Sequence, residues 1–261
     1  MNNTFDRLRY PTVAHDILDR IVATQRDAID RAVSVVADTI RRDGIVHAFG
    51  TGHARLVAHE MAGRAGGLAP VNLVRISDLV TRGGADPALL DPLAERDASL
   101  AQPLYDLHRP RAEDSFVIVS NSGINAAVVE MALLVRRHGH PIVAITSTAH
   151  SASVPSRHPS GQRLADLADF ASLGDKSSVV AIDTGAPRGD AAIALGDGLA
   201  TGATSSLAGI AIVQLITEGV CRALLDAGVT PPLYRSMNLP DTDAGNAGLE
   251  RRYRRVHPIE A

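Results

Sequence analysis

The sequence contains no tryptophan, only 3% aromatic residues, one cysteine and one lysine. Few aromatic side chains exclude the stacking platforms expected of a single-strand binder or of a protein that grips long polysaccharides. The single cysteine, Cys221, cannot form an internal disulfide, which fits a reducing compartment. Lys176 is the only candidate for a Schiff base or a P-loop lysine, and its polar surroundings at residues 172–178 favour neither.

A strong excess of charge and a long hydrophobic run are also absent. The 26 basic and 29 acidic residues leave a formal net charge of −3, so no global field attracts a polyanion, and we expect neither nucleic acid nor a membrane as a partner. The most apolar stretch, Leu207 to Ile216, is shorter than the roughly 20 residues of a membrane span. Residues 1–20 lack the apolar centre of a signal peptide, so we expect a cytoplasmic protein.

The composition that remains is that of a globular protein, with 45% hydrophobic and 21% charged residues over 261 positions. This length can bury a substantial core without metal or disulfide. We expect a helical extension over residues 1–44, a domain over residues 45–230 and an irregular tail over residues 231–261.

Apolar periodicity predicts alternating helices and strands. Steps of three and four residues between Ile17 and Ile40 predict two helices, or one that is kinked near Gln25. Further helices are expected at residues 53–64, 100–107, 126–138 and 203–225, strands at 45–49, 71–76, 115–119, 141–145 and 179–183, and loops at 82–111 and 149–162. Continuous apolar strands separated by helices indicate an α/β fold, a parallel sheet between two helix layers.

Two predicted turns have the composition of a phosphate cradle. One is Gly50-Thr51-Gly52 and the other is Ser120-Asn121-Ser122-Gly123, and each follows a strand and opens a helix. Glycine lets backbone amides approach an anion, while Ser and Thr add hydroxyl donors. A dinucleotide site is not favoured, because Arg55 stands where the third glycine of that motif would be. A third hydroxyl-rich turn, Thr146-Ser147-Thr148, follows the next strand.

These turns together resemble the SIS (sugar isomerase) domain. The resemblance extends to His59-Glu60-Met61-Ala62-Gly63-Arg64, Ser156-Arg157-His158-Pro159-Ser160-Gly161, Asp183-Thr184-Gly185-Ala186-Pro187-Arg188-Gly189-Asp190 and Pro231-Pro232-Leu233-Tyr234-Arg235-Ser236, which look like bacterial SIS-domain proteins described as phosphosugar-binding. It implies a three-layer sandwich with a five-stranded flavodoxin-like parallel sheet, a sugar-phosphate site at the carboxyl edge of the sheet, and a homodimer or homotetramer.

The resemblance also implies which residues bind the substrate. Phosphate contacts carry over to Ser120, Ser122 and Asn125, where Asn125 replaces the Ser or Thr common in SIS proteins but can still donate through its amide. In the first loop Ala54 stands where many SIS domains have Ser. The full set expected to bind substrate is Gly50, Thr51, Gly52, His53, Ser120, Asn121, Ser122, Gly123, Asn125, Thr146 and Ser147.

Glu60 is the main candidate for a catalytic base. The run Glu60-Met61-Ala62-Gly63-Arg64 resembles Glu-Leu-Thr-Gly-Arg of sedoheptulose-7-phosphate isomerases, where the glutamate acts as a base. Aldose–ketose isomerisation needs such a base to move a proton between adjacent carbons through an enediol. The alternative is an ion pair with Arg64 at the i,i+4 spacing that stabilises helices.

The partner acid is less defined. The histidine that those isomerases carry on the last helix has no counterpart at residues 205–221. His53 is taken as the second catalytic candidate, and His59, His150 or His158 could take that role. No metal site is expected, because the pairs His138 with His140 and His150 with His158 lack a third ligand, and no cofactor is expected.

Three functions remain open. The first is a sugar-phosphate isomerase, and a related one is elimination or ether cleavage of an amino-sugar phosphate, since both need a base beside an acidic C–H. The third is a phosphosugar sensor without catalytic activity. The roughly 44 residues before the first strand are too few for a DNA-binding domain, so such a sensor would act through protein partners.

Overall fold

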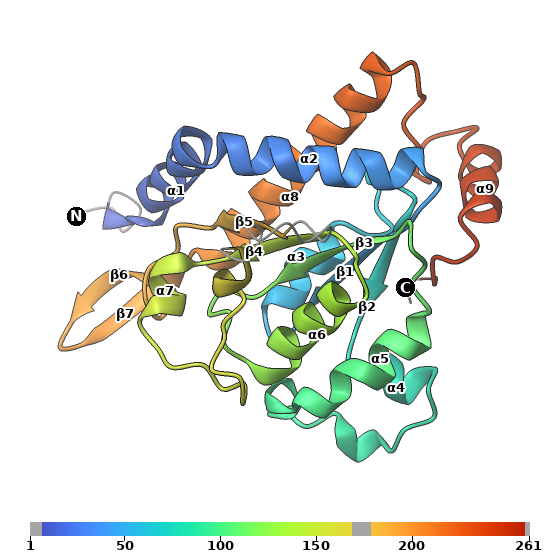
Figure 1. The fold of residues 1–261 in the computed structure, drawn as a ribbon. Helices are drawn as coiled ribbons and strands as arrows, with labels where there is room; N and C mark the ends of the chain where they lie inside the picture. Colours follow the sequence, from blue (N-terminus) through green and yellow to red (C-terminus); the bar gives the residue numbers. More distant parts are fainter. Residues whose placement is uncertain (1–6, 169–178, 259–261) are drawn as a thin grey trace.

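A five-stranded parallel sheet forms the centre of the molecule (Figure 1). The computed structural model describes residues 7–168 and 179–258. The strand order is β2-β1-β3-β4-β5, the flavodoxin-like order, and every neighbouring pair is parallel. The strands are β1 (Val46–Gly50), β2 (Val71–Val74), β3 (Ser115–Val119), β4 (Ile142–Thr146) and β5 (Val179–Asp183). The predicted fold class is therefore confirmed.

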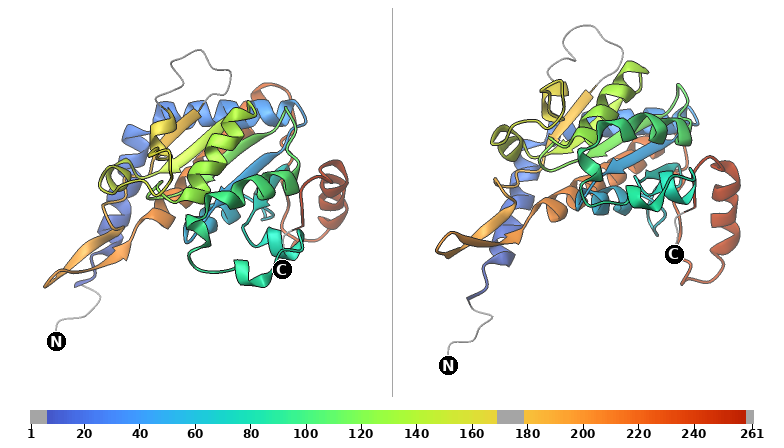
Figure 2. Two further views of the ribbon diagram at one scale, coloured as in Figure 1. Left: turned by 60° about the horizontal axis from the view of Figure 1, so that its bottom comes forward. Right: turned by 90° about the horizontal axis from the view of Figure 1, so that it is seen from below.

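Helices cover both faces of this sheet. One layer contains α2 (Arg26–Arg41), α3 (Ala54–Glu60) and α8 (Ser205–Asp226), and the other contains α5 (Ala101–His108) and α6 (Ala126–Arg137) (Figures 1 and 2). All residues of β1 to β4 are buried. In β3, Val117 packs with the first layer and Phe116 with the second. Because both faces of the sheet are buried, the strands are continuous apolar runs and do not alternate between apolar and polar residues.

The N-terminal region forms two helices that meet at Gln25, one of the two predicted alternatives. The first is α1 (Tyr10–Thr24) and the second is α2. In α2, Ala28, Ala32 and Val36 recur at four-residue steps and are buried, so this face packs into the same core as the sheet. The division of the chain at residue 44 stays a prediction, and α2, which precedes it, shares the core of the sheet.

Two loop predictions are corrected by the structure. The predicted loop at residues 149–162 begins within α7 (Thr148–Ala152), whose N-terminus is capped by the Ser147 hydroxyl. The tail from Pro231, expected to be irregular, contains α9 (Asp243–Arg252). The excursion at residues 82–111 holds three 3-10 helices, η2 (Pro87–Leu89), η3 (Ala94–Arg96) and η4 (Ala98–Leu100), after the short helix α4 (Asp78–Thr81).

A β-hairpin that the sequence did not predict projects from the domain. It consists of β6 (Ala191–Gly196) and β7 (Leu199–Ala203) and lies beside α1, where the Tyr10 hydroxyl donates to the carbonyl oxygen of Ala203 at 2.8 Å. Figure 2 shows the hairpin and α9 at opposite ends of the molecule.

The helix α8 is long and apolar enough, by length and composition alone, to cross a membrane, with a mean hydropathy of 1.6. In this fold it packs against α2 and α3, and Ala208, Ile212 and Ile216 are buried in the core beside the sheet. An apolar core helix passes the same test as a membrane span, and 39% of the apolar window of α8 is buried in this fold.

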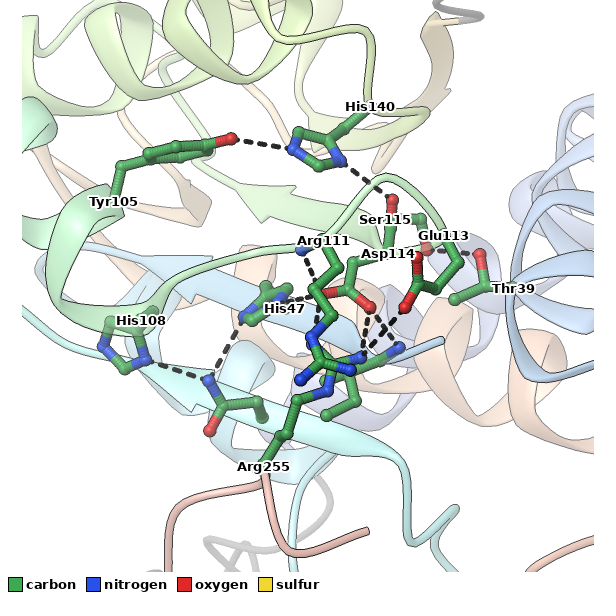
Figure 3. A network of polar contacts seen from close by, with 12 residues as sticks. Thr39, His47, Tyr105, His108, Arg111, Glu113, Asp114, Ser115, His140 and Arg255 are labelled. Carbon is green, nitrogen blue, oxygen red and sulfur yellow. Dashed lines mark hydrogen bonds and ion pairs between the residues drawn. The ribbon is translucent and has the colours of Figure 1, made fainter. Parts of the chain in front are cut away.

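A buried polar network holds the tail against the amino edge of the sheet (Figure 3). Asp114, just before β3, accepts two hydrogen bonds of 2.8 Å from the guanidinium of Arg255 and one of 3.2 Å from the ring of His47. Asn72 bridges the rings of His47 and His108 and accepts a hydrogen bond from the backbone of His257. The tail is thus fixed at the edge opposite to the predicted site.

Candidate functional site

A cavity of about 310 Å³ lies at the carboxyl edge of the sheet, where the loops after β1, β3 and β5 meet. It is bounded by the N-termini of α3, α6 and α8. Its lining consists of Thr51, Gly52, His53, Ala54, Val57, Glu95, Val119, Ser120, Asn121, Ser122, Asn125, Ile145, His150, Thr184, Asp190, Ser205 and Ser206. Seven of the predicted site residues are therefore brought together in one cavity.

The first loop presents Thr51, Gly52 and His53 to the cavity. Gly52 has φ of +55°, a conformation that favours glycine because side chains crowd the backbone there. A Cβ at this position would also come within 3.1 Å of Oε2 of Glu95. The Glu95 carboxylate therefore lies against the backbone of the first loop.

The second loop presents Ser120, Asn121, Ser122 and Asn125. The Ser120 hydroxyl is buried and accepts a hydrogen bond of 3.1 Å from the backbone N–H of Gly123. This bond leaves the hydroxyl proton of Ser120 available as a donor. Asn125 is the N-cap residue of α6 and is only 7% exposed.

Four predicted binding residues do not line the cavity. Gly50 ends β1 and Gly123 lies in the turn after β3, and a Cβ on Gly50 would come within 2.7 Å of the carbonyl oxygen of Ala54. The Thr146 hydroxyl donates to the carbonyl oxygen of Asn121 at 3.3 Å, and the Ser147 hydroxyl donates to that of Ala186 at 2.7 Å. These residues support the loops that line the cavity.

The helix N-termini at the cavity differ in their capping. At α8, the carboxylate of Asp190 accepts hydrogen bonds from the backbone N–H of Thr204 and Ser205, at 3.0 and 2.7 Å. In α3 and α6 no acidic residue stands in the first turn. Since a helix N-terminus attracts negative charge, the N-terminus of α6, next to Ser120 and Ser122, can stabilise an anion.

The described lining of the cavity contains two carboxylates and no permanently basic side chain. Its described lining contains no lysine or arginine, and the ionisable groups are His53, His150, Glu95 and Asp190. An anion bound there would be held by hydroxyl, amide and backbone donors. Such donors select a ligand by geometry more than by net charge.

Glu60 does not line this cavity. It lies at the end of α3, where its carboxylate pairs with Arg64 and accepts a hydrogen bond of 2.7 Å from the side-chain amide of Gln214 on α8. The ion pair with Arg64, one of the two alternatives for this residue, is therefore present. Its role as a base stays a prediction.

The candidate acids are dispersed. His53 and His150 line the cavity, and the ring of His150 lies 3.4 Å from the amide of Asn121. His158 lies outside it, where its ring nitrogen is 2.8 Å from the carboxylate of Glu130. Burial and the Glu218 carboxylate raise the pKa of the Cys221 thiol, which disfavours a reactive thiolate.

Several lining residues were not predicted, and they differ in how they could have been found. Thr184 and Asp190 follow β5, so the rule that ligands bind beyond the carboxyl ends of parallel strands could have included them. The same rule does not reach Glu95, because η3 belongs to the excursion between β2 and β3 and has no periodic pattern.

Neither a metal site nor a second cavity with predicted site residues is found among the described residues. Residues 7–168 and 179–258 contain no group of three His, Cys, Asp or Glu residues that could hold a metal ion. A larger cavity of about 650 Å³ lies between residues 63–65, residues 234–238 and α9, and it contains none of the predicted site residues. Lys176 lies outside the described residues.

The chain is similar to curated proteins over nearly its whole length. A UPF0309 protein of Streptomyces coelicolor is 36% identical over 243 residues, which cover 92% of each chain. A UPF0309 protein of Listeria monocytogenes serotype 4b is 31% identical over 251 residues, 96% of each chain.

Solved structures share the fold at low sequence identity. The phosphoheptose isomerase of Neisseria gonorrhoeae superimposes with a TM-score of 0.53 at 16% identity, over 84% of this chain and 100% of that chain. The Vibrio vulnificus NanR protein, complexed with ManNAc-6P, gives a TM-score of 0.50 at 13% identity, over 96% of this chain and 70% of that chain.

The family model of the SIS domain matches residues 9–147. This range contains the first two helices, four of the five strands and both glycine- and serine-containing loops at the cavity. The chain therefore belongs to the SIS domain family and to the UPF0309 proteins.

Proposed function

We propose that the cavity at the carboxyl edge binds a sugar phosphate and that the protein is a cytoplasmic aldose–ketose isomerase. The observation that carries this proposal is the grouping of Ser120, Ser122 and Asn125 at the N-terminus of α6, where no acid occupies the first turn. Hydroxyl and amide donors at such a terminus suit a phosphate group.

The size of the cavity and the relatives support this ligand class. A volume of about 310 Å³ suits a small molecule. The solved neighbours include a phosphoheptose isomerase and a protein complexed with ManNAc-6P. The reaction proposed here needs no cofactor, because an enediol forms by proton transfer alone.

The proton carrier is proposed among the carboxylates near the first loop. Glu60 is supported by its place in the run Glu60 to Arg64, although its carboxylate is held by Arg64 and Gln214 outside the cavity of its own chain. Glu95 is the second candidate, because it lines the cavity directly, whereas the Asp190 carboxylate caps α8. His53, which also lines the cavity, is the proposed partner acid.

Glu60 has a route to a substrate if the protein assembles as a homodimer or homotetramer. The partly exposed apolar residues Leu18, Val22 and Leu215 border a hollow that also contains Gln214, the hydrogen-bond partner of Glu60. A second copy that covers this face would bring its own groups next to Glu60. We therefore propose that assembly, with sites near the contact between copies.

The two carboxylates are distinguished by substituting each of them. Sugar phosphates that raise the melting temperature are incubated with the protein in D₂O, and deuterium entry next to the carbonyl is followed by NMR. We expect Glu60→Gln to lower exchange by about a hundredfold or more, since general bases contribute 10²–10⁴-fold, while binding persists. Exposed Glu250→Gln is the control.

The outcomes separate the alternatives. Loss of exchange in Glu95→Gln but not in Glu60→Gln would transfer the base role to Glu95. Activity restored by mixing Glu60→Gln subunits with Ser120→Ala/Ser122→Ala subunits would support a site shared between copies. Binding with neither exchange nor product in the wild type would contradict the isomerase and favour the sensor, whereas elimination products would favour the lyase.

A further inference from the structure

The segment from Ser156 to Leu164 is bonded to the serine-containing loop from outside the cavity. The backbone N–H of Arg157 donates to the carbonyl oxygen of Ile124 at 3.0 Å, and that of Leu164 donates to Gly123 at 2.8 Å. A guanidinium nitrogen of Arg157, Nη1, donates to Oδ1 of Asn125 at 2.6 Å. Three bonds from this one segment therefore reach the loop that contains Ser122 and Asn125.

The segment is itself fixed by internal bonds. The Ser156 hydroxyl donates to the carbonyl oxygen of Gln162 at 2.6 Å and accepts from the backbone N–H of His158 at 3.0 Å. The ring of His158, with 7% of its side chain exposed, bonds to Glu130 on α6 at 2.8 Å. Because the segment is tied to α6 at His158, Arg157 is held close to the N-cap of that helix.

The bond from Arg157 determines which way the Asn125 amide points. A guanidinium group only donates hydrogen bonds, so the oxygen of Asn125 must face it. The NH₂ group of Asn125 then points away from Arg157, and Asn125 is a lining residue of the cavity. A reversed amide would place an acceptor toward the cavity and two donors against the guanidinium.

We propose that Arg157 is a positioning residue that presents the Asn125 amide as a hydrogen-bond donor to the anionic group of the ligand. The inference rests on the proposed binding of a sugar phosphate. It assigns a role to the Ser-Arg-His-Pro-Ser-Gly run, which the proposed reaction does not otherwise use. Arg157 acts through Asn125, whereas Asn125 itself contacts the ligand.

The test is a double-mutant cycle with inorganic phosphate as the probe, whose dissociation constant is measured by calorimetry. We expect Arg157→Met to weaken phosphate binding about tenfold, the effect of losing one hydrogen bond to a charged group. Asn125→Ala should weaken it at least as much, and adding Arg157→Met to Asn125→Ala should change nothing further, since the two residues act as one unit.

A second variant at Asn125 distinguishes a positioning role of Arg157 from a role in stabilising the loop. A hydroxyl rotates freely and needs no partner to turn its proton toward an anion. In Asn125→Ser protein, Arg157→Met should therefore leave the dissociation constant unchanged. Arg188→Met, which removes a charge from an exposed position after β5, is the matched control.

The outcomes distinguish this inference from the proposed function. Equal weakening by Arg157→Met in the wild-type, Asn125→Ala and Asn125→Ser backgrounds would overturn the positioning role, because it would show an effect of charge or loop stability. Unchanged binding in Arg157→Met alone would overturn it too. If the wild type binds neither inorganic phosphate nor any sugar phosphate, the proposed function fails as well.

Discussion

Asp114 carries the polar network at the amino edge of the sheet. Burial alone would raise the pKa of this carboxyl, but hydrogen bonds from Arg255, His47 and the backbone N–H groups of Arg111 and Ile45 outweigh it and hold the pKa well below its ordinary value. Burial also lowers the pKa of His47, so its ring is neutral near pH 7. The closest pair of opposite charges around Arg255 is therefore the one it forms with the buried Asp114, at 2.8 Å, against 3.9 Å for its pair with Glu113.

Removing that charge should destabilise the fold in a pH-dependent way. Asp114→Asn removes the buried charge partner of Arg255 and leaves it only the longer pair of 3.9 Å with Glu113, so at pH 7 we expect a loss of about 3 kcal/mol in the free energy of unfolding. A carboxyl whose pKa is lowered by folding contributes stability above its unfolded pKa of about 3.9, and the contribution is lost as the pH falls further. Denaturant unfolding at pH 7 and at pH 3 measures both effects.

The control for this prediction is a second ion pair of the tail. Asp43 pairs with Arg252 in an exposed position, with 67% of the Asp43 side chain accessible. Asp43→Asn should change stability little, because solvent screens exposed pairs. An Asp114→Asn protein as stable as the wild type at pH 7, or a difference that does not shrink in acid, would refute the role given to Asp114.

Among the elements, α8 depends on glycine for its close approach to α3. A Cβ on Gly209 would come within 2.7 Å of Cγ2 of Val57, which also lines the cavity. Overpacking of this kind costs about 1–3 kcal/mol, against a gain of about 0.5–1 kcal/mol from replacing glycine in a helix. We expect Gly209→Ala to lower the free energy of unfolding by about 1 kcal/mol.

A substitution at Val57 and a glycine in open space test whether the loss of stability comes from this clash. Val57→Ala should relieve the contact, so the double variant should be more stable than the sum of the single changes predicts. A Cβ on Gly245 of α9 meets no atom within 4 Å, so Gly245→Ala should leave stability unchanged or raise it. Additive behaviour of Gly209→Ala and Val57→Ala would count against a direct clash.

Elements that contribute to the core were predictable, and the exposed ones were not. The five strands and α6 have apolar residues that the sheet buries, and this burial produces the pattern in the sequence. In α9 only Asn246 is buried, and most of the hairpin from β6 to β7 is exposed. Such elements lack an apolar period because little of their surface is buried. The hairpin is instead held by polar contacts such as the hydrogen bond from Tyr10 to Ala203.

At the scale of the whole molecule, the parallel topology gathers the site from distant parts of the sequence. The sequence alone located Thr51, Ser120 and Ser122, because each follows a strand and the carboxyl ends of parallel strands share one edge. Glu95 could not be located, since its position depends on the path of an irregular excursion. The same limitation applies to Arg255, which lies far along the chain from its partner Asp114.

The central claim is that the serine-containing loop binds the phosphate of a sugar phosphate, and a thermal-unfolding comparison tests it most directly. Sugar phosphates are compared with the same sugars without phosphate, on wild-type protein and on Ser120→Ala/Ser122→Ala, with exposed Ser34→Ala as the control. A ligand at a hundred times its dissociation constant adds about 2.7 kcal/mol of stability, and each hydroxyl lost removes about 0.5–1.5 kcal/mol of binding. We predict stabilisation by phosphorylated sugars alone, weakened in the double variant. Equal stabilisation by unphosphorylated sugars, or unchanged binding in the double variant, would contradict the claim.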